Sequence, residues 1–133
     1  MDSENVPEHL DIPKTKDKPH VLFTASSGSL LIEGESYPEN AQDFYRPIVE
    51  MLEAYCAGDH ARLLVEFKLQ YFNSSSSKCL LNILDLLEEF AAKGGEVTVN
   101  WFYEEQDEDL KESGEDFADG LAIPFNIVGI SLA

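Results

Sequence analysis

Two stretches of alternating apolar and polar residues, separated by one amphipathic helix, constrain the fold of this chain more than any other feature. Apolar side chains occupy every second position in residues 62–72, and the same alternation recurs in residues 97–103. This pattern is typical of strands with one buried face. Between them, residues 79–91 carry apolar side chains at helical spacing, and Gly94-Gly95 marks the end of that helix. The sequence therefore predicts a strand–helix–strand unit.

The same alternation indicates which face of the sheet is covered. Strands with helices on both faces are apolar throughout, and these two are not. We therefore expect helices mainly on one face and a partly polar second face. Leu64 and Phe102 fall on the polar side, where an exposed ring would indicate a docking surface. The side chains expected on the buried face of the first strand are Leu63, Val65, Phe67, Leu69 and Tyr71.

The N-terminal part of the chain predicts an arm followed by a hairpin. Residues 1–19 are polar and interrupted by three prolines, and we expect a flexible arm there. Residues 21–25 and 29–32 are short apolar segments on either side of a Ser-Ser-Gly turn, which is typical of a hairpin. Residues 33–40 are expected to be a loop that ends in a helix-capping asparagine, Asn40.

The remaining segments complete an α/β chain. Residues 44–55 have helical spacing, and Pro47 either kinks this helix or marks a second start. A short helix is expected within the acidic segment 104–119, followed by a last strand over residues 125–130. The predicted order is ββαβαβαβ, a mixed sheet of about five strands. Residues 20–133 then form a single domain.

Charge and composition exclude several classes of protein. The 133 residues include nine Lys and Arg against 26 Asp and Glu, for a net charge of −17. Nucleic acid and anionic membrane surfaces both repel such a chain. There is no apolar run of the ~18 residues that a transmembrane helix needs, and the acidic N-terminus does not resemble a signal peptide. We expect a cytoplasmic protein without membrane insertion.

The residues that commonly carry catalysis or bind metals are scattered. Cys56 and Cys79 are best interpreted as small buried thiols. His9, His20 and His60 have no second His or Cys at ligand spacing. Neither a GxSxG elbow nor a P-loop is present. The sequence therefore predicts no enzyme, no metal site and no cofactor.

A serine run at a strand-to-helix corner is the most distinctive local feature. Such a corner presents unpaired backbone N–H groups and the positive end of the helix dipole. Three interpretations stay open: plain helix capping, noncovalent binding of a phosphate ligand, and covalent phosphorylation of a hydroxyl. The run and its neighbours are Tyr71, Phe72, Asn73, Ser74, Ser75, Ser76, Ser77 and Lys78.

The layout and this corner resemble the STAS fold of anti-sigma-factor antagonists. In those proteins a serine of an Asp-Ser-Ser-Gly corner is phosphorylated by a partner kinase, and Asn73-Ser74-Ser75 stands in that place here. The chain is more similar still to the SiaC family of bacterial regulatory phosphoproteins, over about residues 20–130. The segments that carry this similarity are Gly34-Glu35-Ser36-Tyr37-Pro38-Glu39-Asn40, the serine run continuing into Asp85-Leu86-Leu87-Glu88-Glu89, Val97-Thr98-Val99-Asn100-Trp101, and Pro124-Phe125.

The SiaC resemblance implies a non-enzymatic signalling switch of the kind used in biofilm regulation. Family members are phosphorylated by a dedicated protein kinase and dephosphorylated by a PP2C-type phosphatase. In the namesake system the unphosphorylated form activates a diguanylate cyclase, so the implied output is such a cyclase or another regulator. The family's modified residue is usually a threonine after Tyr-Leu-Asn. By position it falls on Ser74, where serine is a departure, and Ser75, Ser76 and Ser77 are alternatives.

The resemblance also implies roles for the neighbours of the modified serine. Asn73 caps the helix and orients the corner, with Tyr71 and Lys78 as further support. A partner-binding loop is expected beside the corner, formed by Tyr37, Pro38, Glu39 and Asn40. One competing hypothesis is a STAS-like domain that binds a small ligand or anion without covalent modification, and it predicts a pocket between the sheet and the second helix. Another is an acidic scaffold with no switch. The oligomeric state is left open.

Overall fold

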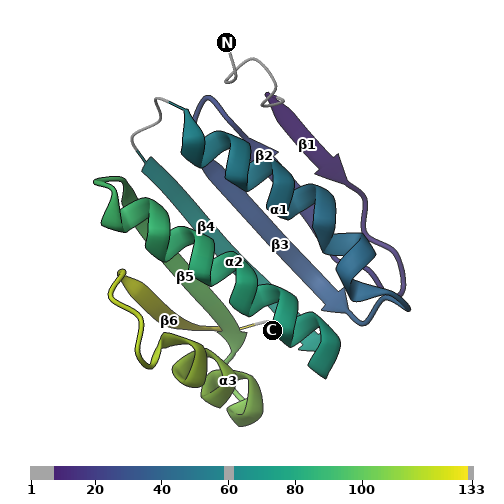
Figure 1. The fold of residues 1–133 in the computed structure, drawn as a ribbon. Coiled ribbons are helices and arrows are strands. Elements are labelled where there is room, and N and C mark those ends of the chain that lie inside the picture. Colours follow the sequence, from purple (N-terminus) through teal and green to yellow (C-terminus); the bar gives the residue numbers. More distant parts are fainter. Residues whose placement is uncertain (1–7, 59–61, 132–133) are drawn as a thin grey trace.

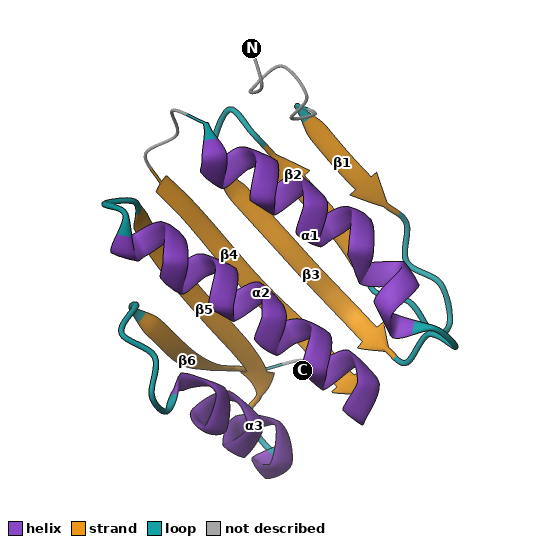
Figure 2. Cartoon of the chain, in the orientation of Figure 1, coloured by secondary structure: helices purple, strands orange, loops and turns teal. Residues whose placement is uncertain are grey.

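The computed structural model describes residues 8–58 and 62–131, which form an α/β domain of six strands and three helices (Figures 1 and 2). The strands are β1 His9–Ile12, β2 His20–Thr24, β3 Ser29–Ser36, β4 Arg62–Phe72, β5 Glu96–Glu104 and β6 Phe125–Ile130. The helices are α1 Ala41–Ala57, α2 Ser74–Ala92 and α3 Glu108–Ala118.

The strands form one mixed sheet in the order β1-β2-β3-β4-β5-β6. The β1–β2 and β2–β3 pairs are antiparallel, and the β3–β4, β4–β5 and β5–β6 pairs are parallel. Each parallel pair is connected through a helix, as parallel strands require. The predicted α/β layout, mixed sheet and hairpin are thus confirmed.

The core lies between the sheet and helices α1 and α2, which run side by side across one face (Figure 1). Alternate side chains of β4 and β5 point into it, including the fully buried Val65, Phe67, Val99 and Trp101. α3 packs beside them through Phe117, whose ring centroid lies 5.3 Å from that of Trp101. None of the helices in the described residues covers the opposite face of the sheet. Leu64 lies there with 37% of its surface exposed, as its place in the alternation predicted.

The segment expected to be a flexible arm contains a strand. β1 pairs with β2 at the edge of the sheet, where Leu10 lies opposite Phe23 and Ile12 opposite Val21. Four residues with two apolar side chains carry too little alternation to predict a strand, and the neighbouring strand supplies the hydrogen-bonding edge that orders them. The sheet accordingly has six strands, not five. The first seven residues of the expected arm lie outside the described residues.

A β-bulge overturns the predicted orientation of Tyr71. Gly34 pairs with Leu69 but Glu35 pairs with Tyr71, so β4 contains one extra residue at Gln70. A bulge of this kind reverses the side-chain alternation beyond it. Tyr71 therefore leaves the core and is 51% exposed, and Phe72 packs edge-on against Trp101 instead, with ring centroids 5.9 Å apart.

Other boundaries differ from the predicted ones in smaller ways. β3 continues to Ser36, so Glu33 to Ser36 are strand and only the following residues are loop. Pro47 lies inside a single continuous helix, α1. The short helix expected in the acidic segment is α3, and its apolar side chains Leu110 and Phe117 are buried.

Candidate functional site

The serine run forms the first turn of α2, immediately after β4 ends. Asn73 is the N-cap, and its side-chain Oδ1 accepts a hydrogen bond from the backbone N–H of Ser76 at 2.9 Å. Its carbonyl accepts from the N–H of Ser77, also at 2.9 Å. The predicted capping role of Asn73 is therefore confirmed. Because one residue caps the helix, the hydroxyls of the four serines are not needed for that purpose.

The four serines have different environments. Ser74 and Ser75 are exposed, Ser77 is half-buried, and Ser76 has no exposed surface. Backbone N–H groups in the first turn of a helix have no acceptor within the helix, and the dipole there is positive. The hydroxyl of Ser74 lies at the first position of this turn, so a negative charge on it meets a favourable field and open solvent.

A cluster of buried hydroxyls connects the corner to β3 and α1 by hydrogen bonds. The Oγ of Ser36 lies 2.8 Å from the Oγ of Ser76 and 2.7 Å from the phenol oxygen of Tyr45. All three side chains are buried. Burial raises the pKa of Tyr45 to about 12, so its phenol stays protonated and able to donate. This hydroxyl cluster (Ser36, Tyr45 and Ser76) joins the end of β3, helix α1 and the first turn of α2.

The predicted partner-binding loop lies beside the corner. The backbone N–H of Asn73 donates to the carbonyl of Ser36 at 3.2 Å, and the rings of Tyr37 and Tyr71 meet edge to face with centroids 5.8 Å apart. Pro38 is buried. Parallel β3 and β4 end at the same edge of the sheet, and this brings the loop and the corner together.

The remaining predicted residues of the loop and the helix point to solvent. Glu39 is exposed, and Asn40 is exposed while its Oδ1 caps α1 by accepting from the N–H of Asp43 at 3.1 Å. Lys78 lies one turn beyond Ser74 and, among the described residues, has no ion-pair partner. Tyr71, Ser74 and Lys78 are thus exposed at the corner, and Tyr37 is half-buried.

Sequence reasoning missed the hydroxyl cluster. Ser36 falls in the segment expected to be loop, and Tyr45 lies among the apolar residues of a predicted helix. The Ser36–Tyr45 contact joins positions nine residues apart in the chain, and the Ser36–Ser76 contact joins positions 40 residues apart. Only the Tyr45 hydroxyl in an otherwise apolar stripe could have pointed to a buried partner.

The side chains that could bind a metal are dispersed over the described part of the chain. Across residues 8–58 and 62–131, no three His, Cys, Asp or Glu side chains gather where they could hold a metal ion. Cys79 is buried and Cys56 half-buried, both as free thiols. His60 lies outside the described residues. No described helix is long and apolar enough to cross a membrane.

The site is thus an exposed serine at a capped helix N-terminus of an α/β domain, held by buried contacts. Comparison with known families assigns this domain: residues 12–130 match the family model described as SiaC family regulatory phosphoprotein. The chain belongs to the SiaC family.

Relatives of known sequence and structure agree with this assignment. An uncharacterized protein of Pseudomonas aeruginosa strain UCBPP-PA14 is 34% identical over 118 residues, which cover 89% of this chain and 94% of that protein. The crystal structure of apo-SiaC from Pseudomonas aeruginosa matches with a TM-score of 0.86 at 32% identity, covering 92% of this chain and 100% of that one. A chain in the crystal structure of the diguanylate cyclase SiaD in complex with its activator SiaC, from the same organism, matches with a TM-score of 0.88 at 33% identity, covering 91% of this chain and 99% of the other.

Proposed function

We propose that this protein is a non-enzymatic cytoplasmic switch in which phosphorylation of Ser74 controls binding to a partner protein. The observation that carries the proposal is the exposure of the Ser74 hydroxyl at the start of α2, on a corner that buried contacts hold in place. A protein kinase adds the phosphoryl group and a PP2C-type phosphatase removes it. Ser76 is a poor acceptor because its hydroxyl is buried and bonded.

The proposed output partner is a diguanylate cyclase. Support comes from the related SiaC of Pseudomonas aeruginosa, an activator whose structure in complex with the cyclase SiaD matches this chain closely. We propose that the docking surface combines the corner with the exposed face of α2. Ser74, Lys78 and Leu81 follow one another at four- and three-residue spacing and so share one face of the helix. Leu81 is 45% exposed, an apolar anchor for a partner.

The proposed switch is electrostatic. A phosphoserine carries about −1.5 to −2 charge at pH 7, and the helix N-terminus tolerates it, so the fold persists while the surface changes. A partner that covers Ser74 would have to desolvate this charge. To move the partner from almost fully bound to almost fully free, the binding free energies of the unphosphorylated and phosphorylated forms must differ by about 5.5 kcal/mol. A dianion inside a dehydrated interface supplies much of that difference.

Binding of a SiaD-type diguanylate cyclase to matched variants tests the proposal. Wild-type protein and Ser74→Ala should bind equally well, and Ser74→Asp should bind at least about tenfold more weakly, since one interfacial charge is worth more than 1.4 kcal/mol when desolvated. Ser75→Asp places the same charge one residue further around the helix and serves as the control. If both aspartates weaken cyclase binding equally, the effect comes from net charge and not from the position of Ser74. If Ser74→Asp does not weaken binding, Ser74 is not the residue that controls it.

A further inference from the structure

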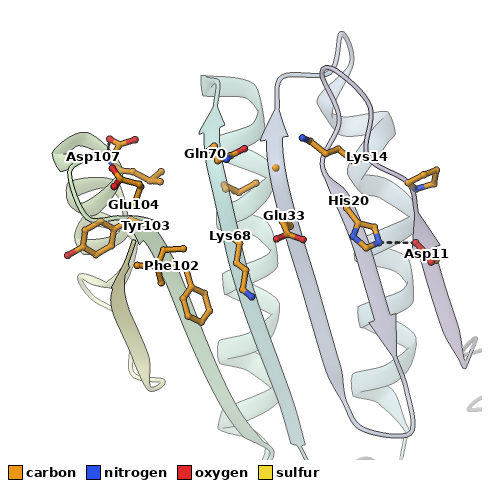
Figure 3. A pocket seen from close by; sticks show the side chains of 15 residues that line it. Asp11, Lys14, His20, Glu33, Lys68, Gln70, Phe102, Tyr103, Glu104 and Asp107 are labelled. Atoms are coloured by element: carbon orange, nitrogen blue, oxygen red, sulfur yellow. Dashed lines mark hydrogen bonds and ion pairs between the residues drawn. The ribbon is translucent and has the colours of Figure 1, made fainter. Parts of the chain in front are cut away.

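The geometry points to a second binding site, on the open face of the sheet, for a small organic anion with an apolar ring-containing body. A cavity of about 790 Å³ lies on that face (Figure 3). Its volume falls within the range of small-molecule sites, roughly 300–1,000 Å³. The serine corner contributes none of its residues. The pocket predicted between the sheet and α2 is a different place, because the helices pack on the other face.

The centre of the cavity holds a lysine without an anionic partner. The Nζ of Lys68 lies 5.0 Å from the ring centroid of Phe102, held there by a cation–π contact. Lys14 reaches the same cavity from the β1–β2 connection. Neither ammonium group forms an ion pair with another residue in the described ranges. The lining also carries four carboxylates, so an anionic group is attracted only beside the two lysines.

The end of the cavity toward β5, β6 and α3 combines apolar side chains with two carboxylates. Phe102, Leu110 and Ile130 line it, together with the ring of Tyr103. The two carboxylates at this end are already engaged, since Glu104 accepts from the N–H of Gln106 at 3.0 Å and Asp107 caps α3 through the N–H of Leu110 at 3.0 Å. A ring or chain can therefore pack there while an anionic group attached to it reaches Lys68.

Glu33 restricts which anions fit. It lies directly opposite Lys68 in the β3–β4 register, yet its carboxylate has no hydrogen-bond or ion-pair partner among the described residues. His20 and Asp11, on the far side, satisfy each other at 3.0 Å. The ligand must keep its anionic group toward Lys68 and is favoured if it also offers an N–H or O–H donor to Glu33.

Fluorescence titration with anilinonaphthalene sulfonate tests the site, because this dye combines an aromatic body, a sulfonate and an N–H donor. Lys68→Gln should weaken dye binding by about fivefold, the effect of removing one partly exposed charge pair. Glu33→Gln should strengthen it, because it removes a repelling carboxylate and keeps an acceptor. Lys93→Gln, a change of the same kind at the far end of α2, should leave the affinity unchanged. All three positions reach solvent, so the fold should tolerate them.

An uncharged dye separates the role of charge from that of apolar burial. Phenylnaphthylamine has the same ring system without the sulfonate, and its affinity should change less than about twofold in Lys68→Gln. The site would be established if Lys68→Gln and Glu33→Gln change the affinity of the sulfonate in opposite directions while the affinity of the neutral dye stays the same. Equal affinities of the sulfonate for all three variants, or no binding of it to the wild type below about 1 mM, would overturn it.

Discussion

The hydroxyl cluster of Ser36, Tyr45 and Ser76 decides how firmly the corner is held. Its three hydroxyls are buried and within 2.8 Å of a neighbour. Tyr45→Phe should lower the free energy of unfolding by about 1 kcal/mol, the usual contribution of one buried hydrogen bond. Ser76→Ala should cost a similar amount, and the double variant less than the sum, because both changes act on the one Ser36 hydroxyl.

Urea unfolding measures these costs. Ser75→Ala is the control, since its side chain is exposed and its removal should change stability by less than about 0.5 kcal/mol. Additive effects of Tyr45→Phe and Ser76→Ala would show that the hydroxyls act independently and would contradict the cluster.

The two cysteines should be slow to react. Burial raises the pKa of the Cys56 thiol to about 11 and also raises the pKa of the Cys79 thiol. The thiolate is the reactive form, so labelling of the native protein with a disulfide reagent at pH 8 should be at least about tenfold slower than labelling of the urea-unfolded chain. The rate should rise as the pH approaches 11. Equal rates for the folded and unfolded chains would contradict the burial of these thiols.

At the scale of elements, α3 is fixed to the sheet by the close approach of Gly114 to Trp101. A Cβ at position 114 would overlap the indole ring, whose Nε1 donates to the carbonyl of Leu110 at 3.0 Å. Gly114→Ala should therefore destabilise the protein by about 1–3 kcal/mol through overpacking, despite the better helix propensity of alanine. Trp101 is the only tryptophan, so its fluorescence reports both the unfolding transition and any shift of the ring.

Ser113→Ala tests whether the effect belongs to that contact. It changes the neighbouring residue of α3, which makes only a local hydrogen bond to the carbonyl of Asp109, and should change stability by less than about 0.5 kcal/mol. If Gly114→Ala is as stable as wild type, the Trp101 ring can shift to make room for the added methyl group without a cost in stability, and the contact does not fix α3.

The elements that the sequence predicted well are those whose own residues carry the signal. The alternation of β4 and β5 and the apolar stripe of α2 each span several turns or pleats, and Asn73 has the residue type that caps a helix. β1 and the bulge at Gln70 were not predicted, and the reason is the same for both. Each depends on pairing with a neighbouring strand. The position of the corner serine could be predicted, but the hydroxyl cluster beneath it could not, because it joins side chains from three elements.

For the molecule as a whole, the net charge of −17 should make stability depend on salt. Like charges on a compact protein repel one another, and the Debye length falls from about 30 Å at 0.01 M to about 10 Å at 0.1 M salt. The melting temperature should therefore rise by a few degrees over this range. Choline chloride at equal ionic strength should act like sodium chloride. A falling melting temperature, or a rise with sodium alone, would contradict screening as the cause.

Mapping the phosphorylated residue tests the central claim most directly. The protein would be purified from its native host with phosphatase inhibitors present, and its intact mass and fragments measured beside those of Ser74→Ala. We expect one added phosphoryl group, located on Ser74 and absent from the variant. A phosphoryl group on Ser75 or Ser77 would keep the switch but move its acceptor. Absence of any phosphoryl group under several growth conditions, and after incubation with the partner kinase, would contradict the switch itself.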